Sequence, residues 1–218
     1  MEGSRAMRLK IAVFASGRGS NLKAIIDAIE DGALGATIVC VVSNNCDAYA
    51  LTIAREHGLP VFALSHKGIS REEHETRILE HLQDMEIDFI VLAGYMRVLT
   101  GNFLKEFKDA AGFFRVINIH PALLPAFKGG NGYEDAFNYG VKVSGITIHL
   151  VDEEVDHGPI LAQRAFPRLA DDTLESFRAR GLALEHALYP EVLASIVNVG
   201  VDSLLIKDSK CGQVTRTS

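Results

Sequence analysis

Short apolar segments alternate with amphipathic segments along the first half of this 218-residue chain. The apolar segments are rich in Val, Ile, Leu and Phe, a pattern typical of strands that are buried on both faces. The amphipathic segments carry apolar residues at helical spacing. Strands that alternate with helices favour a parallel sheet with helices on both of its faces. The expected strands are 9–15, 37–42, 61–64, 89–93 and 113–119, and the expected helices start near residues 20, 48, 70 and 102.

The pattern changes after residue 125. Two strand-like segments, 144–151 and 160–166, follow each other closely and suggest an antiparallel addition to the edge of the sheet. A short helix is expected at 133–139, and a long one from Thr173 towards Val199. The sequence therefore predicts an α/β fold with a doubly wound, mostly parallel sheet and an antiparallel edge addition. We expect a single domain over residues 8–200, with a disordered leader at 1–7 and a disordered tail at 208–218.

Capping residues predict where three of the helices begin. Ser20 or Asn21 is expected to cap the first helix, because short polar side chains accept hydrogen bonds from free amides there. Ser70 and Glu73 form the pattern of a capping box, and Thr173 is expected to cap the last helix.

The overall charge and the cysteines restrict the class of protein. The formal net charge is −6 and no block of basic residues occurs, so neither nucleic acid nor an anionic membrane is expected as a partner. No apolar run is long enough to span a bilayer. Cys40, Cys46 and Cys211 are scattered without the spacing of a metal site, which predicts reduced thiols in a cytoplasmic protein and no bound metal.

The first strand is followed by the sequence S-G-R-G-S-N, residues 16–21, and then by a helix. Glycines at Gly17 and Gly19 would let the backbone approach a phosphate, and the start of a helix offers free N–H groups. The third glycine of the dinucleotide fingerprint is missing, and the second strand ends without an acidic residue, so NAD is disfavoured. A monophosphate on a small substrate fits better, with a plain tight turn as the alternative.

Asn118 and His120 lie at the end of the strand expected at 113–119, which Pro121 terminates. Side chains alternate along a strand, so these two point the same way. In open α/β sheets, ligands bind at the carboxyl ends of the strands. The pair is therefore a candidate site, and a polar strand end with a solvated histidine is the alternative.

Three further segments are predicted to reach the same edge of the sheet. One is the apolar loop 94–99 with its single Arg97, which could also be a simple turn. Another is His149, which by itself is better explained as a buried histidine with satisfied hydrogen bonds. The third is the acidic loop 152–159, which could be a solvated turn.

Four segments together resemble one known family: S-G-R-G-S-N, L-A-G-Y-M-R-V-L, N-I-H-P-A-L-L-P and V-D-E-E-V-D-H-G-P. In this order they resemble the phosphoribosylglycinamide formyltransferases of purine biosynthesis, which are folate-dependent formyltransferases, over residues 9–199. The resemblance implies formyl transfer from 10-formyltetrahydrofolate to the amine of 5-phosphoribosylglycinamide, by a monomer or homodimer without metal or NAD. The alternatives are a related transferase or hydrolase with another acceptor, and a non-catalytic phosphate-binding module.

The resemblance also implies roles for individual residues. The implied catalytic residues are Asn118, His120 and Asp156, with the Asp156 charge raising the pKa of His120. The implied substrate-binding residues are Gly19, Ser20 and Asn21 at the phosphate, and Glu185. The implied folate-binding residues are Arg71, Met96, Arg97, Val98, Leu99, Asn118, Asp152, Val155 and Asp156.

Four positions depart from the pattern of the family. Asn131 and Tyr133 stand where some members carry histidines, Lys128 where proline is common, and Leu182 where some relatives have a polar residue. A role for a second histidine in this region is therefore not expected. Substrate recognition near Leu182 is assigned to Glu185 instead.

Overall fold

The structure is a computed structural model that describes residues 8–205, so the predicted leader, the predicted tail and Cys211 lie outside the described residues. Its strands form one sheet in the order β3-β2-β1-β4-β5-β6-β7. The pairs from β3 to β5 are parallel, and β5-β6 and β6-β7 are antiparallel. This confirms the predicted sheet. The strands are β1 (Leu9–Phe14), β2 (Ala36–Ser43), β3 (Val61–Ala63), β4 (Phe89–Leu92), β5 (Val116–His120), β6 (Val143–Leu150) and β7 (Ile160–Pro167).

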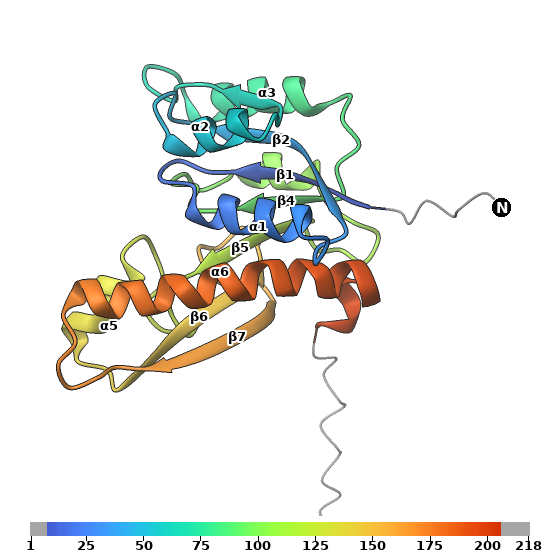
Figure 1. The fold of residues 1–218 in the computed structure, drawn as a ribbon. Coiled ribbons are helices and arrows are strands. Elements are labelled where there is room, and N and C mark those ends of the chain that lie inside the picture. Colours follow the sequence, from blue (N-terminus) through green and yellow to red (C-terminus); the bar gives the residue numbers. More distant parts are fainter. Residues whose placement is uncertain (1–7, 206–218) are drawn as a thin grey trace, which may run out of the picture.

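Helices cover both faces of the sheet (Figure 1). The long helix α6 runs beside α1 across one face, and α5 packs against the first part of α6. The helices are α1 (Ser20–Glu30), α2 (Tyr49–Glu56), α3 (Arg71–Leu82), α4 (Gly101–Lys105), α5 (Gly132–Tyr139) and α6 (Leu174–Val199), and a 3-10 turn, η1 (Val201–Ser203), follows.

The alternation of side chains along β1 divides the core into two clusters. Ile11 and Val13 belong to a cluster that includes α1, α2 and α6, whereas Ala12 and Phe14 belong to the cluster with α3 and α4. All four side chains are fully buried. From Ile11 to Phe14 the central strand therefore needs apolar residues at every position, which explains the uninterrupted apolar sequence there.

Strand β5 begins later than predicted, at Val116 instead of residue 113. The Asp109 carboxylate accepts hydrogen bonds from the amides of Gly112 and Phe113, which closes a turn there. The apolar character of residues 113 and 114 does not distinguish a turn that packs on the core from a strand.

The helix starts agree with the predicted caps only in part. The prediction for α1 was wrong, since Gly19 is its N-cap residue and no side chain caps it. Ser70 caps α3 as expected, but Glu73 pairs with Arg77 and does not close the capping box. Thr173 caps α6 as predicted, in a reciprocal box with Ser176.

A single tyrosine connects α6 to the middle of the sheet. Tyr189 is fully buried, and its hydroxyl lies 3.0 Å from the carbonyl oxygen of Leu92 and 3.1 Å from that of Ile117. These carbonyls belong to β4 and β5. The contact fixes α6 against β5, whose end carries Asn118 and His120, and against the neighbouring strand β4.

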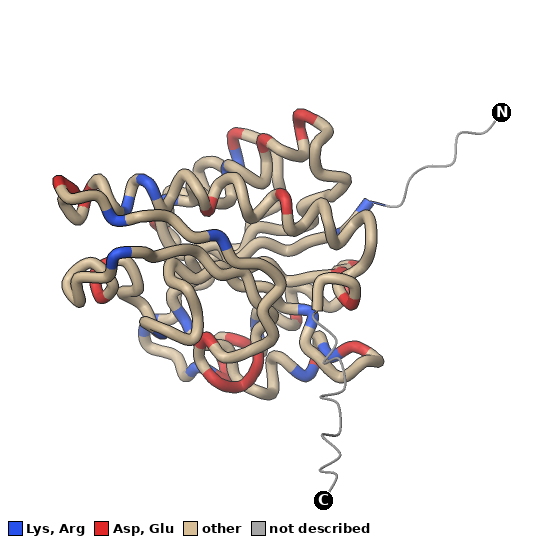
Figure 2. Tube along the Cα trace, turned by 90° about the horizontal axis from the view of Figure 1, so that it is seen from below, with Lys and Arg blue, Asp and Glu red and all other residues tan. Residues whose placement is uncertain are grey.

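Charges of both signs are spread over the described part of the chain. Lys and Arg residues are interspersed with Asp and Glu along the trace (Figure 2). Within residues 8–205, no helix combines the length and the apolar character needed to cross a membrane.

Replacement of Tyr189 by Phe tests the connection between α6 and the sheet. The variant keeps the ring but removes the donor to two buried carbonyls, so we expect the free energy of unfolding to fall by about 1–3 kcal/mol. Urea denaturation measures the loss. The matched control is Tyr49→Phe, whose side chain is 59% exposed, and equal stability of the two variants would contradict the assignment.

Candidate active site

A cavity of about 730 Å³ opens at the carboxyl ends of β1, β4 and β5. Its walls come from residues 16–21, 92–99, 118–121, 129–134 and 151–156, together with the first half of α6. This volume lies within the range of small-molecule sites, about 300–1,000 Å³. Four of these segments carry the motifs identified in the sequence, so the fold brings them to one place.

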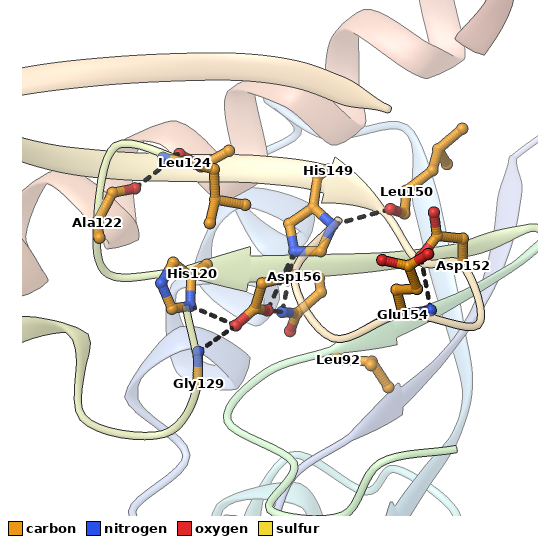
Figure 3. Close-up of polar contacts among 12 residues, drawn as sticks. Leu92, His120, Ala122, Leu124, Gly129, His149, Leu150, Asp152, Glu154 and Asp156 are labelled. Carbon is orange, nitrogen blue, oxygen red and sulfur yellow. Dashed lines mark hydrogen bonds and ion pairs between the residues drawn. The ribbon is translucent and has the colours of Figure 1, made fainter. Parts of the chain in front are cut away.

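Asp156 lies at the centre of the polar part of the cavity (Figure 3). Its Oδ2 accepts a hydrogen bond of 2.7 Å from the Gly129 amide and lies 3.2 Å from Nδ1 of His120. Its Oδ1 lies 3.4 Å from Nδ2 of Asn118 and 3.5 Å from Nε2 of His149. The carboxylate therefore touches both polar residues of the β5 end. The predicted group of Asn118, His120 and Asp156 is assembled in space.

The environment of Asp156 favours its charged form. Burial alone would raise the pKa of this carboxyl, but the hydrogen bonds from His149 and from the Gly129 amide, together with the charge of His120, outweigh burial and lower it. The backbone of Asp156 has φ 49°, in the left-handed region, where Asp is better tolerated than most residues. The loop thus uses a less favourable backbone conformation at the residue that reaches both histidines.

His120 is 3% exposed, and both of its ring nitrogens face acceptors. Nε2 lies 2.8 Å from the carbonyl oxygen of Phe127 and donates to it, which leaves Nδ1 facing Asp156. Burial lowers the pKa of His120 below its usual value, and the attraction of Asp156 only partly opposes this effect. The sequence-based expectation of a raised pKa was therefore wrong, because it considered the nearby charge and not the cost of burying an imidazolium.

The sequence interpretation named His149 near this edge of the sheet but assigned it no role in the site. His149 is 2% exposed, its Nδ1 donates to the Leu150 carbonyl, and its Nε2 lies 3.2 Å from Nδ2 of Asn118. The expectation of a satisfied buried histidine holds, but its partners belong to the site. The antiparallel register pairs Asn118 with His149, and this register was not readable from sequence spacing.

The loop after β1 approaches α2 closely. Gly19 has φ 73°, and a Cβ atom there would lie 2.7 Å from Cα of Ala50, so only glycine fits. The amides of Ser20 and Asn21, at the start of α1, have no partner within the helix by helix geometry. The loop therefore combines free N–H groups with a positive helix end, as an anion site requires.

An apolar rim borders part of the cavity. Met96, Val98 and Val155 are among the exposed large apolar side chains of the chain, and all three line the cavity together with Arg97. The Met96 amide donates to the hydroxyl of Ser16, which positions the loop that carries Met96 and Val98. Ser16 is a second residue to which the sequence interpretation assigned no role of its own.

A second buried carboxylate, Glu185 of α6, lies in the cavity wall. Its Oε2 accepts a 2.6 Å hydrogen bond from Nδ2 of Asn21, and its Oε1 accepts one from the hydroxyl of Tyr133. Burial raises the pKa of Glu185. The Asn21 side chain is thus used to bind Glu185, and only its backbone is available to a phosphate.

The structure does not bring every predicted residue to the cavity. Arg71 is exposed at the start of α3 and does not line it, so its folate contact stays a prediction without support here. Lys128 lines a small cavity of about 90 Å³ beside Asp156, whereas Asn131 and Leu182 line the main cavity. Leu99 and Asp152 line the main cavity as well.

Neither Cys40 nor Cys46 lines the cavity. Burial raises the pKa of the Cys40 thiol to about 11, so it is protonated at neutral pH and a weak nucleophile. Cys40 and Cys46 form no disulfide. In the part of the chain that the structure describes, no three His, Cys, Asp or Glu side chains are grouped as a metal would require.

A model of the formyl transferase family matches residues 9–193. The chain belongs to the formyl transferase family. This formyltransferase is 42% identical to the phosphoribosylglycinamide formyltransferase of Haemophilus influenzae, over 84% of its own chain and 85% of that relative. It is 39% identical to the phosphoribosylglycinamide formyltransferase of Bacillus subtilis, over 87% of its own chain and 95% of that relative. These matches confirm the resemblance seen in the motifs.

Comparison with solved structures gives the same result for the formyltransferase. The phosphoribosylglycinamide formyltransferase of Bacillus halodurans superposes with a TM-score of 0.82 at 39% identity, covering 87% of this chain and 96% of that one. A trifunctional purine biosynthetic protein of Drosophila melanogaster is 42% identical over 88% of this chain, which spans only 14% of that longer protein. The formyltransferase therefore corresponds to one part of that protein.

Replacement of Gly19 by Ala tests the close approach of the first loop. The positive φ and the contact with Ala50 should together reduce the free energy of unfolding by at least about 1–2 kcal/mol. The control is Gly17→Ala, because a Cβ atom at Gly17 meets nothing within 4 Å. Urea denaturation compares the two variants, and an equal effect of both would contradict the assignment.

Replacement of Asp156 by Asn tests the electrostatics of His120. The variant keeps the shape but removes the attractive charge, so the pKa of His120 should fall further, by about one pH unit or more. NMR titration of the imidazole Cε1–H resonance measures it. The control is Asp152→Asn, since Asp152 pairs with His157 at 2.7 Å and not with His120. An unchanged or raised pKa of His120 in Asp156→Asn would contradict the assignment.

Proposed function

We propose that this formyltransferase transfers the formyl group of 10-formyltetrahydrofolate to the amine of 5-phosphoribosylglycinamide in purine biosynthesis. The observation that carries the proposal is the convergence of Asn118, His120 and Asp156 between an anion-binding loop and an apolar rim in one cavity. Identity of 42% to a phosphoribosylglycinamide formyltransferase, over most of both chains, supports the choice of acceptor.

The acceptor occupies the side of the cavity near α1. The backbone of Gly19, Ser20 and Asn21 receives the phosphate, because free amides and a helix start stabilise an anion. Glu185 accepts hydrogen bonds from the ribose hydroxyls or the amine. The local amides are needed, since the formal net charge of the chain is −6 and opposes an anionic substrate.

The folate occupies the side of the apolar rim. Met96, Val98 and Leu99 contact the ring system, mostly through the backbone of their loop, and Arg97 lies near the carboxylated tail. The loop that carries Asp152, Val155 and Asp156 closes over the pterin. Exposed apolar side chains beside a cavity support this assignment, because such groups usually mark a site for an apolar ligand.

The reaction forms one C–N bond and breaks another. The amine attacks the formyl carbon, negative charge develops on the formyl oxygen, and the bond from carbon to the folate nitrogen then breaks. The Asn118 amide and His120 in its protonated form, which burial makes less abundant, donate hydrogen bonds to the developing charge, a contribution of roughly 3–4 kcal/mol for each such donor. The acceptor amine loses one proton and the folate nitrogen gains one, so the overall proton count is balanced.

His120 and Asp156 divide the proton transfers between them. His120 gives its proton to the departing folate nitrogen as a general acid. Asp156 stabilises the imidazolium and orients a water that takes the proton from the amine. The Nε2–H group of His120 is bonded to the Phe127 carbonyl in the unliganded chain, so substrate must replace that partner before the proton can be donated from this nitrogen.

The remaining expectations from the sequence belong to the same proposal. Residues 8–200 act as one formyltransferase domain, as a monomer or homodimer in the cytoplasm. Its partners are small molecules and neither nucleic acid nor a membrane. The interspersed charges along the trace support this last point (Figure 2).

Substitutions of the central residues test the proposal. Asn118→Ala and His120→Ala should each reduce kcat by at least about 100-fold, because each removes a donor to the transition state. The assay follows formyl transfer to 5-phosphoribosylglycinamide spectroscopically. Circular dichroism checks that the variants are folded, and Arg55→Ala, at an exposed position outside the cavity, serves as the control. Near-normal turnover of His120→Ala, or no transfer by the wild-type chain to this acceptor, would contradict the proposal.

A further inference from the structure

Glu185 is held by donors from two other helices. The hydroxyl of Tyr133, on α5, lies 2.5 Å from its Oε1, and Nδ2 of Asn21, on α1, lies 2.6 Å from its Oε2. Glu185 is 5% exposed and Tyr133 is 7% exposed. Each carboxylate oxygen thus has one protein donor, and the two contacts together fix the plane of the carboxylate.

The absence of a side chain at Gly181 makes the tyrosine contact possible. A Cβ atom at Gly181 would lie 2.2 Å from Cε1 of Tyr133 and 2.5 Å from its hydroxyl oxygen. Phe177, one turn earlier on α6, meets the same phenol edge to face, with ring centroids 6.4 Å apart and planes at 88°. Tyr133 and Gly181 therefore form a matched pair, since any larger residue at 181 would displace the ring.

The cluster retains acceptors for a ligand. A carboxylate offers about four lone-pair positions, and the two protein donors use two of them. Oδ1 of Asn21 is buried and has no hydrogen-bond partner among the described residues. Asn21, Tyr133 and Glu185 all line the main cavity. The cluster therefore suits a ligand that donates hydrogen bonds, such as a sugar diol or an amine.

We propose that Tyr133 is a positioning residue of this enzyme. Its hydroxyl, paired with the Asn21 amide, orients the Glu185 carboxylate towards the hydroxyl or amine groups of the glycinamide ribonucleotide, and Gly181 provides the space for it. The inference rests on the proposed function, because it assigns the ligand of Glu185. It concerns the acceptor substrate alone, since the contact of Tyr133 with Glu185 involves no residue of the apolar rim that is assigned to the folate.

The pKa of Glu185 gives a readout that a change in packing alone would not alter. Burial raises the pKa of Glu185, and the hydrogen bonds from Tyr133 and Asn21 oppose this effect. Burial and the adjacent carboxylate also raise the pKa of the Tyr133 hydroxyl, so it stays a donor. Loss of that donor should raise the pKa of Glu185 further. Tyr133, Arg178 and His186 influence the pKa of Glu185. Glu185 in turn raises the pKa of Tyr189.

The test is steady-state kinetics of the full chain with Tyr133→Phe, Gly181→Ala and the double variant. Tyr133→Phe should raise KM for 5-phosphoribosylglycinamide about tenfold or more, the usual effect of losing a hydrogen bond to a charged group. KM for 10-formyltetrahydrofolate should stay unchanged. The acid limb of the kcat/KM profile for the ribonucleotide should move to higher pH. Gly181→Ala should act in the same direction, and the double variant should be no worse than the more impaired single variant.

The matched control is Tyr139→Phe, which removes a phenolic hydroxyl from the same helix at a position that is 81% exposed. It should leave both KM values and the pH profile unchanged. Tyr133→Phe keeps the ring, so it decides the question even if Gly181→Ala does not fold. Unchanged kinetics of Tyr133→Phe in a chain whose wild type is active would overturn only the positioning role. A wild type that does not formylate this acceptor would overturn the proposed function as well.

Discussion

The contacts of the Asp156 carboxylate are the interactions on which the site depends. Asp156 belongs to the 152–159 loop. It connects this loop to the end of β5 through His120 and to the 121–131 segment through the Gly129 amide. A second buried carboxylate, Glu185, lies in the same cavity, but its surroundings act in the opposite direction. Histidines and a backbone amide lower the pKa of Asp156, whereas burial dominates at Glu185 and raises its pKa. Two carboxylates of one cavity can thus serve different roles.

One face of α6 connects this cavity to the sheet. Phe177, Gly181, Glu185 and Tyr189 follow one another at intervals of four residues, so they lie along one side of the helix. Tyr189 binds the carbonyls of β4 and β5, and Glu185 lies one turn away in the cavity wall. The position of the helix is set by the strand ends that carry Asn118 and His120. A buried hydrogen bond in the core therefore also determines where the acceptor side of the cavity lies.

Much of the fold was predictable because its signals are local. The apolar strands, the antiparallel addition and the cap at Thr173 were found from patterns within a few residues. The early start predicted for β5 and the cap expected at Ser20 or Asn21 failed for a different reason. Asp109 closes a turn where the strand was expected, and Gly19 takes the N-cap position, so Ser20 is already the first residue of the helix.

The sequence by itself determined the class of fold, the strand ends that carry the polar residues, and the family through four motifs in order. Only the tertiary structure decided that His149 lies beside Asn118, that Arg71 lies away from the cavity, and that Tyr133 reaches Glu185 across Gly181. It also reversed the expected direction of the pKa of His120. The physical reason is common to all of these. Strand register, burial and the fit of one side chain into the space of another arise between segments far apart in the chain, and local patterns do not record them.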